Sequence, residues 1–227
     1  MKICGLQKLT LLDYPTKIAC TVFLHGCNFR CPFCHNASLV TGKPYEEISM
    51  ENFFSFLNKR KGILDGVCVT GGEPLVSKEI NEFLNEIKKR GFLVKLDTNG
   101  SFPSKLKDAV KNGLVDYVAM DIKNCPERYD LSTGIKTDLN KINESIEFLK
   151  SGIIDYEFRT TVYKDAFDEY SMKKIGEWIK GAKKYFLQKF VNSGNILGES
   201  EPLDELVILR LLEIVRNYVP NAAVRGI

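Results

Sequence analysis

The chain has 227 residues, of which 44% are hydrophobic and 27% charged, which is ample apolar material for one large core. Its formal net charge of +3 is too small to predict a nucleic-acid partner. No stretch approaches the ~20 apolar residues that span a bilayer, and the N-terminus has no signal-peptide pattern. We therefore expect a cytoplasmic protein without a membrane partner, with one domain over residues 1–227.

Short apolar strands alternate with amphipathic helices along the chain. Strands are predicted over residues 18–24, 67–70, 92–96, 116–122, 156–162 and 185–187, and helices begin near residues 49, 80, 103, 139, 172 and 206. The apolar face of the last helix is predicted to comprise Leu206, Leu209, Leu212 and Val215. This alternation predicts a parallel α/β sheet wrapped by helices, either doubly wound or an incomplete β/α barrel, since six repeats are too few for an eight-stranded barrel.

Three closely spaced cysteines follow the first predicted strand. Cys27, Cys31 and Cys34 have the spacing C-x3-C-x2-C, and the aromatic Phe33 precedes the third. Three thiolates on one loop can bind three irons of a [4Fe–4S] cluster, which usually has four protein ligands, and leave one iron open for chemistry. The alternative is a structural Cys3His zinc site completed by one of the two flanking histidines. The other four cysteines are scattered, which predicts small buried thiols.

Polar motifs follow the later predicted strands. Ligands of parallel α/β folds bind at the carboxyl ends of the strands, so residues at these ends are expected to form one site. In chain order they are Gly71, Gly72, Glu73, Pro74, Asp97, Thr98, Asn99, Asp121, Lys123, Arg159 and Gln188.

Each motif has a second interpretation. The two glycines let the backbone approach a ligand, and Glu73 can accept from an ammonium group, but Pro74 also fits an ordinary strand-to-helix turn. Asp97 can form an Asx turn instead of a ligand contact, and Lys123 can be a surface lysine. A charged Arg159 within a strand is costly unless it is paired, so we expect either a ligand carboxylate or a structural salt bridge as its partner.

The cysteine loop resembles that of the radical S-adenosylmethionine (SAM) enzymes. Residues 97–100 (Asp-Thr-Asn-Gly) and 121–123 (Asp-Ile-Lys) resemble segments of the activating enzymes of glycyl radical enzymes, and residues 11–15 (Leu-Leu-Asp-Tyr-Pro) with the stretch 20–39 carry the resemblance of the chain to one member of that group. Within that group the chain is most similar to the activating protein of anaerobic ribonucleoside-triphosphate reductase, over nearly its whole length. The resemblance implies a partial (β/α)6 barrel of parallel strands with two cofactors, one [4Fe–4S] cluster per chain and SAM.

The resemblance also implies a role for each motif. Cys27, Cys31 and Cys34 would ligate the cluster, and Asp97 and Asp121 would pair with Lys123 or with a small cation beside the SAM carboxylate. The implied SAM-binding residues are Phe33, Gly71, Gly72, Glu73, Pro74, Asp97, Thr98, Asn99, Asp121, Lys123, Arg159 and Gln188. The implied reaction is reductive cleavage of SAM with an electron from flavodoxin or ferredoxin, which generates a glycyl radical on a partner enzyme. No side chain is expected to act as a catalytic base.

The chain departs from the family pattern at a few positions. Thr16 stands where a glycine is expected, and Ala37 where proline is common. Gln188 and its neighbours lack the histidine of pyruvate formate-lyase activases, which argues against that partner. The alternatives are an activase of another glycyl radical enzyme, a radical SAM enzyme acting on a small molecule such as a deazapurine, and a zinc-stabilised binding module. Lys95 and the loop 192–195, which is also a candidate lid, are possible partner contacts.

Overall fold

The computed structural model describes residues 1–42, 47–192 and 194–227. Two compact units make up the chain. The first comprises Met1–Asn28, Ser38–Thr98 and Phe102–Val118, and the second Phe29–Ala37, Asn99–Ser101 and Ala119–Ile227. Among the described residues, none of the helices combines the length and apolar character that a membrane span requires. The expectation of one domain over residues 1–227 stays a prediction.

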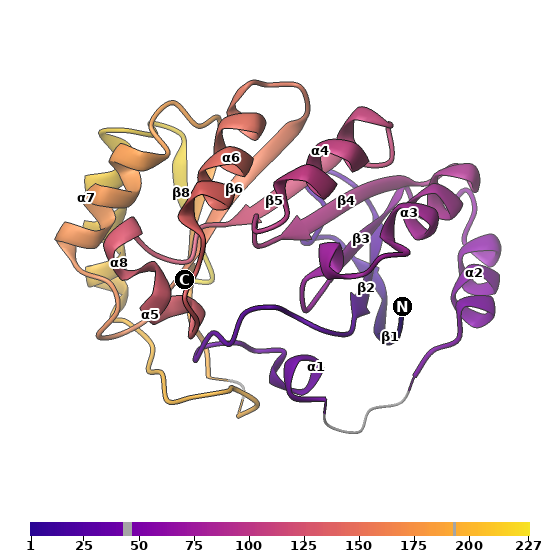
Figure 1. The fold of residues 1–227 in the computed structure, drawn as a ribbon, viewed down its shortest axis with the longest axis horizontal. Coiled ribbons are helices and arrows are strands. Elements are labelled where there is room, and N and C mark those ends of the chain that lie inside the picture. Colours follow the sequence, from indigo (N-terminus) through magenta and orange to yellow (C-terminus); the bar gives the residue numbers. More distant parts are fainter. Residues whose placement is uncertain (43–46, 193) are drawn as a thin grey trace. The chain divides into compact units, whose positions relative to one another are not determined.

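The first unit is built on a mostly parallel sheet (Figure 1). Its strands are β1 (Ile3–Thr10), β2 (Ala19–Leu24), β3 (Gly66–Gly71) and β4 (Leu93–Thr98). Strands β2, β3 and β4 pair in parallel, whereas β1 runs antiparallel to β2 at one edge. The helical segments of this part of the chain are α1 (Ala37–Thr41), α2 (Met50–Lys59), the 3-10 turn η1 (Pro74–Val76), α3 (Ile80–Lys89) and α4 (Pro103–Lys111).

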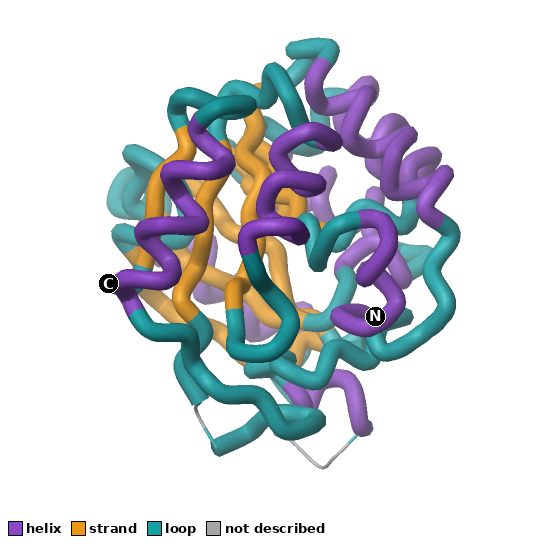
Figure 2. Tube along the Cα trace, turned by 90° about the vertical axis from the view of Figure 1, so that its left-hand side faces the viewer, coloured by secondary structure: helices purple, strands orange, loops and turns teal. Residues whose placement is uncertain are grey.

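Strand β5 (Tyr117–Asp121) begins in the first unit and ends in the second. The second unit continues with β6 (Asp155–Val162), β7 (Tyr185–Lys189) and β8 (Ala222–Arg225), and β6, β7 and β8 pair in parallel. Its helical segments are η2 (Pro126–Arg128), α5 (Tyr129–Thr133), α6 (Leu139–Lys150), α7 (Glu169–Trp178) and α8 (Glu205–Arg216). Figure 2 distinguishes these helices and strands along the trace.

Apolar burial explains why these segments form. Strands β2 and β3 bury side chains on both faces, as strands of a helix-covered parallel sheet do. Helix α3 turns Ile80, Phe83, Leu84 and Ile87 inward, which is the face that the sequence predicts. Polar caps start other helices: Ser49 accepts from the Asn52 amide at α2, and Asp168 forms a capping box with Ser171 at α7.

The predicted alternation is confirmed, with additions at both ends. In the described part of the chain the six predicted strands correspond to β2 through β7, and each is followed by a helix. Strands β1 and β8 were not predicted. In β1 the consecutive exposed residues Gln7, Lys8 and Leu9 interrupt the alternation of apolar and polar residues, and β8 has only four residues. The short helices α1 and α5 were missed for the same reason of length.

The predicted apolar face of α8 is half wrong. The buried residues are Ile208, Leu211, Leu212 and Val215, whereas Leu206 and Leu209 are exposed. Residues spaced by three along an α-helix are offset by about 60° around its axis at each step. After two turns, residues in such a series therefore no longer lie on the same face. The spacing of three and four that the buried residues follow stays on one face.

The leader segment between β1 and β2 forms an ordered loop. The Thr10 hydroxyl oxygen accepts from the amides of Leu12 and Asp13, each at 3.2 Å, and the Thr21 hydroxyl donates to the Asp13 carboxylate. Thr16 follows with a φ of 62°, in the left-handed region. This backbone conformation gives a physical reason for the glycine expected there, since only glycine adopts it without strain.

We expect Thr16→Gly to raise the free energy of unfolding by about 0.5–1 kcal/mol. The left-handed conformation costs a residue with a Cβ about 1–2 kcal/mol, which exceeds the entropic cost of a glycine, roughly 0.5–1 kcal/mol. Thr16 is exposed, so its replacement removes little packing. Urea denaturation measures the change, with Thr16→Ala as the control that retains a Cβ. Equal stabilities for the glycine and alanine variants would refute the assignment of strain.

Candidate functional site

The three predicted cluster ligands lie on the loop after β2. Cys27 belongs to the first unit, and Cys31 and Cys34 belong to the second. All three are reduced cysteines, and the Cys34 amide donates to the Cys31 carbonyl at 3.1 Å in a tight turn. No group of three or more His, Cys, Asp or Glu side chains is assembled around a metal position within the described residues. Ligation by these cysteines therefore stays a prediction.

The chemistry of the cysteine loop is compatible with iron. Burial raises the pKa of Cys31 to about 11, and the nearby Lys123 cation acts in the opposite direction. Because cysteine binds metals as the thiolate, iron would displace the proton that this buried thiol otherwise retains. Three reduced cysteines are also the donor type that iron–sulfur clusters use. The donor set therefore fits the implied cluster.

The second half of the cysteine loop is held by aromatic and backbone contacts within the second unit. The Phe33 ring lies 4.7 Å from that of Tyr163, and the His35 ring lies 5.2 Å from that of Phe190. The Arg30 amide donates to the Thr133 carbonyl at 2.7 Å. Burial lowers the pKa of His35, which favours its neutral form. These contacts fix the segment that carries Cys31 and Cys34.

The two motif glycines bring the end of β3 against the start of the cysteine loop. The Gly72 amide donates to the Leu24 carbonyl at 2.9 Å, and the Glu73 amide donates to the Gly26 carbonyl at 2.8 Å. A Cβ added to Gly72 would lie far inside van der Waals contact with the Gly26 oxygen and 3.2 Å from the Cys27 Cβ. Gly71 adopts a φ of 125°, which favours glycine. The motif thus forms a cradle for the loop.

Glu73 has a structural role in this cradle. Glu73 is 2% exposed, and its carboxylate accepts from the Leu75 amide at 3.0 Å and the Thr98 hydroxyl at 2.9 Å. It caps η1, which Pro74 opens, so the strand-to-helix turn considered from the sequence is present. The hydrogen bond to Thr98 brings together two residues that were predicted to share a site.

Asp97 pairs with a lysine of its own strand. Its carboxylate is the partner of the Lys95 ammonium on the same strand, and it also accepts from the Cys68 thiol at 3.7 Å. Lys95 is 1% exposed, so the suggestion that it contacts a protein partner is wrong. The Asx turn considered for Asp97 is made by Asn99, whose side-chain oxygen accepts from the Ser101 amide at 3.0 Å. A lysine inside a buried strand was the sequence signal for this pair.

Asp121 lies between two cations at the end of β5. It accepts from Lys123 Nζ at 3.0 Å and from Arg159 Nε at 2.9 Å. Burial alone would raise the pKa of Asp121, but Arg159 and Lys123 outweigh it and hold the pKa at about 2. The expected pairing of Asp121 with Lys123 is present, and Arg159 forms the salt bridge considered as its alternative. We name these three residues the Asp121 triad; its net charge is +1.

The Asp121 triad is linked to the cysteine loop within the second unit. Lys123 Nζ lies 5.6 Å from the centroid of the Phe33 ring, a cation–π distance. Burial lowers the pKa of Lys123, but the Asp121 carboxylate outweighs burial and raises it above its usual value. Lys123 therefore stays charged beside the loop aromatic.

A further ion pair was missed by sequence reasoning. Arg225 on β8 donates two hydrogen bonds to Glu157 on β6, at 2.7 and 2.9 Å, and its guanidinium lies 3.5 Å from the centroid of the Phe186 ring. The predicted ligand Gln188 pairs in register with Thr161 and Arg225 on the neighbouring strands. The pair was missed because β8 was not predicted. Ser193, in the suggested lid, lies outside the described residues.

We expect Gly72→Ala to lower the free energy of unfolding by about 2–3 kcal/mol, because the added methyl group must displace the backbone at Gly26. Gly91→Ala is the matched control: its added Cβ meets no atom within 4 Å, so only the left-handed strain of about 1 kcal/mol applies. Urea denaturation of the metal-free proteins gives both values. Equal losses in the two variants would mean that the close approach at Gly72 is absent.

The Asp121 triad predicts an acid-dependent contribution to stability. The pKa of Asp121 is held at about 2, below the ordinary 3.8, so the ionised carboxylate stabilises the fold at pH values above 3.8. This stabilisation is lost as the pH falls toward 2. The contribution is about 2 kcal/mol at neutral pH, of which about 1 kcal/mol is lost at pH 3. We expect Asp121→Asn to remove this part of the pH dependence.

The measurement compares urea unfolding of the metal-free protein at pH 6 and pH 3. Asp155→Asn is the control, because Asp155 is 74% exposed and its lysine lies 3.9 Å away. The fall in stability between the two pH values should be about 1 kcal/mol smaller in Asp121→Asn than in the control. Identical falls would contradict the depressed pKa.

Comparisons with known proteins were made for the whole chain. The model of the radical SAM superfamily matches residues 21–170. A protein of Methanocaldococcus jannaschii named as a candidate glycyl-radical enzyme activating enzyme is 32% identical over 99% of this chain and 96% of its own. The pyruvate formate-lyase-activating enzyme of Clostridium pasteurianum is 30% identical over 54% of this chain and 52% of its own. A 7-carboxy-7-deazaguanine synthase of Hyperthermus butylicus is 36% identical over 38% of this chain and 37% of its own.

Solved structures share the fold. A radical SAM methyltransferase from Sphaerobacter thermophilus superposes with a TM-score of 0.71 at 15% identity, over 96% of this chain and 68% of that one. At this identity the likeness concerns the fold, and it confirms the predicted fold class. The family model, the full-length relative and the mostly parallel β/α sheet agree, so the chain belongs to the radical SAM superfamily, whose enzymes use a [4Fe–4S] cluster and SAM.

Proposed function

We propose that this radical SAM enzyme is an activating enzyme that installs a glycyl radical on a partner protein. The observation that carries the proposal is the likeness, over nearly the whole chain, to the Methanocaldococcus jannaschii relative named as an activating enzyme of this kind. The deazaguanine synthase matches a smaller part of the chain. An activase therefore accounts for more of this sequence than an enzyme acting on a small molecule.

The proposed cluster ligands are Cys27, Cys31 and Cys34. A [4Fe–4S] cluster held by them would supply the electron for cleavage of the S–C5′ bond of SAM to methionine and a 5′-deoxyadenosyl radical, which would take a hydrogen atom from a glycine of the partner. The protein's contribution is to hold the ligand loop and exclude water. Gly72 helps to hold the ligand loop, because it lets the end of β3 lie against residues 26 and 27. Phe33 holds the second half of the loop by packing against Tyr163.

The proposed SAM site combines a fixed backbone turn with a group of charged side chains. The sharp turn that Glu73 fixes after β3 holds the backbone of the two preceding glycines in one conformation. The Asp121 triad has a net positive charge, which complements the carboxylate of the SAM methionine group. The wider set proposed for SAM comprises Phe33, Gly71, Gly72, Glu73, Pro74, Asp97, Thr98, Asn99, Asp121, Lys123, Arg159 and Gln188.

We further propose anaerobic ribonucleoside-triphosphate reductase as the partner, and flavodoxin or ferredoxin as the electron donor. Two features support the reductase. The leader of residues 11–15 is ordered by Asp13 and Thr21 and resembles that of reductase activases. Residues 188–190 are Gln-Lys-Phe, without the histidine of pyruvate formate-lyase activases. Another glycyl radical enzyme as partner is the alternative.

The cofactor assignment predicts the result of anaerobic reconstitution with iron and sulfide. The protein is expected to become brown, to bind about four irons per chain, and to show a reduced paramagnetic-resonance signal that shifts on addition of SAM. Cys31→Ala is expected to lose most of the iron and the SAM-dependent shift, whereas the control Cys4→Ala, at a reduced cysteine outside the motif, retains both. A colourless protein with one bound zinc would overturn the assignment.

The same preparation tests the activity. After mixing with reductant, SAM and radical-free reductase, a glycyl radical signal should appear on the reductase, and 5′-deoxyadenosine should accumulate. Cleavage of SAM that is stimulated by a pterin substrate and not by the reductase would instead identify a deazapurine-forming enzyme. A radical on pyruvate formate-lyase but not on the reductase would change the partner and keep the activity.

A further inference from the structure

A buried lysine and a buried cysteine lie side by side in the first unit. Cys68 on β3 and Lys95 on β4 are register partners in the parallel sheet, so their side chains project from the same face. Cys68 is 0% exposed and Lys95 is 1% exposed. Lys95 Nζ lies 3.7 Å from Cys68 Sγ, a hydrogen-bond distance for sulfur. We call these two residues the Lys95–Cys68 pair.

A carboxylate completes this cluster. Asp97 follows Lys95 by two residues on β4, so it projects from the same face of the strand. The Asp97 Oδ1 atom accepts from both members of the Lys95–Cys68 pair, from Lys95 Nζ in a short contact and from Cys68 Sγ at 3.7 Å. Amine nitrogen, thiol sulfur and carboxylate oxygen therefore form a closed triangle, in which each atom reaches the other two.

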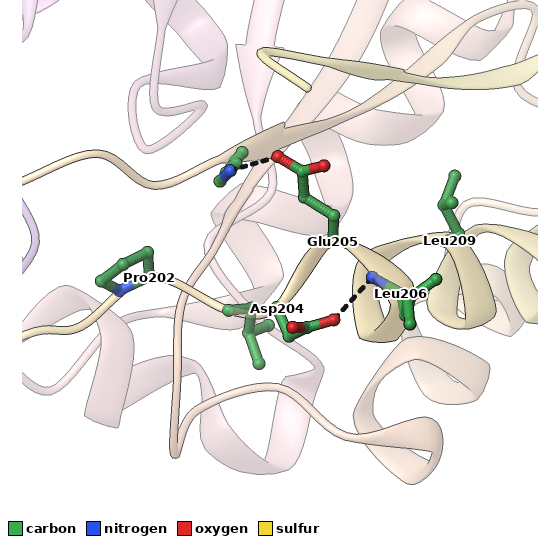
Figure 3. Close-up of a pocket in the computed structure, with 7 residues that line it drawn as sticks. Pro202, Asp204, Glu205, Leu206 and Leu209 are labelled. Atoms are coloured by element: carbon green, nitrogen blue, oxygen red, sulfur yellow. Dashed lines mark hydrogen bonds and ion pairs between the residues drawn. The ribbon is translucent and has the colours of Figure 1, made fainter.

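The salt bridge of Lys95 does not by itself account for the cysteine. Lys189 shows the ordinary arrangement: its Nζ donates to Glu205 at 2.6 Å, the dashed line at Glu205 in Figure 3, and the two side chains are 23% and 55% exposed. Lys95 is out of contact with water, and Asp97 balances its charge. A thiol is a weak hydrogen-bond acceptor, so a hydroxyl at position 68 would serve an ammonium group better. What a thiol adds at this position is redox chemistry.

The surroundings of the Cys68 sulfur favour reaction with the amine beside it. Cationic neighbours make a cysteine reactive toward oxidants, and the Lys95 ammonium is such a neighbour. An oxidised cysteine sulfur reacts with a nearby nucleophile when one is available. The Lys95 nitrogen becomes that nucleophile when it loses a proton, and Asp97 Oδ1 is in place to accept the proton. The triangle thus contains every protein group that a cross-link between the two side chains requires.

We propose that the Lys95–Cys68 pair is a modification site at which dioxygen forms a nitrogen–oxygen–sulfur bridge between the two side chains. Asp97 takes one proton from the Lys95 ammonium and leaves the neutral amine. The amine nitrogen and the thiol sulfur each give up two electrons and one hydrogen to dioxygen. One oxygen atom then lies between nitrogen and sulfur, and the other leaves as water with the two hydrogens. Dioxygen is the oxidant, and the step uses no other co-reactant.

The bridge would join β3 to β4 covalently and remove the positive charge that pairs with Asp97. A dithiol reductant would return the lysine and the cysteine and release the bridging oxygen as water, so the modification is reversible. While it lasts, Cys68 is kept from the sulfinic and sulfonic states, which are not reversed in this way. Because Asp97 belongs to the proposed SAM set, the bridge would also disturb that site; this consequence rests on the proposed function, whereas the bridge itself does not.

Mass spectrometry of the full-length chain in its metal-free form tests the inference. One sample is kept anaerobic, and the other is exposed to air with a chelator present, so that iron takes no part. Both samples are denatured, alkylated without reductant and digested with trypsin. Trypsin does not cleave after a modified lysine, so the bridge would join residues 62–78, which include Cys68, to residues 91–105, which include the uncleaved Lys95.

We expect the linked peptide in the air-exposed sample, with the mass of its two parts plus one oxygen atom and minus two hydrogen atoms. It should be absent from the anaerobic sample and should disappear after treatment with dithiothreitol. Residues 124–128 provide the internal control, because their Cys125 is also 0% exposed. This peptide should be alkylated and unlinked in both samples.

Two variants identify the reacting groups. Lys95→Arg keeps a cation but has no primary amine, and Cys68→Ser keeps a hydrogen-bonding side chain without sulfur. Each is expected to lose the linked peptide, and thermal melts show whether each variant folds. The comparison of the air-exposed and anaerobic samples of the unmodified chain decides the matter even if a variant does not fold.

Four results would overturn the bridge. After exposure to air, Cys68 could be recovered as an alkylated thiol, as a sulfinic acid with residues 91–95 released by trypsin, or in a disulfide with another cysteine. A linked peptide without the added oxygen would show a direct nitrogen–sulfur bond in place of the bridge. None of these results bears on the glycyl radical activity, which is measured on the reconstituted enzyme.

Discussion

The close approach of two backbones is the constraint on which the first unit depends. Strand β3 ends with two glycines, and the second lies so near Gly26 that no side chain fits between them. The parallel pairing of Leu24 with Gly71 brings the two strand ends level, and hydrogen bonds from Gly72 and Glu73 close the gap. The start of the cysteine loop is thus positioned by the absence of a side chain at Gly72 and by the hydrogen bonds that the Gly72 and Glu73 amides donate.

Several charged groups inside each unit are held by opposite charges, which keeps their burial compatible with folding. Lys95 pairs with Asp97 in the first unit, and Asp121 pairs with two cations in the second. Compared with well-packed apolar side chains, such pairs add little net stability, because desolvation offsets much of the attraction. In the proposed function their value is to keep a cation charged and oriented, so that it meets an anionic ligand without further rearrangement.

The strand–helix order and the motif residues could be predicted from the sequence. Buried runs such as that of β3 are recognisable because parallel strands bury both faces, and the motifs follow strand ends because ligands bind there. The edge strands could not be predicted in the same way. Strand β1 exposes Gln7 and Lys8, and four-residue β8 has too short a pattern, yet β8 supplies Arg225 to the buried Glu157.

The sequence by itself indicated the chemistry, through the cysteine spacing and the resemblance to radical SAM enzymes. The spacing of Cys27, Cys31 and Cys34 is a local property, since three thiolates on one loop need no distant partner to be recognised. Only the tertiary structure decided how the other residues pair. Asp97 proved to pair with Lys95, and Leu206 proved to be exposed and not part of the core. Pairing and burial depend on strand register and on the angular position around a helix, and both are set by packing among segments far apart in the chain.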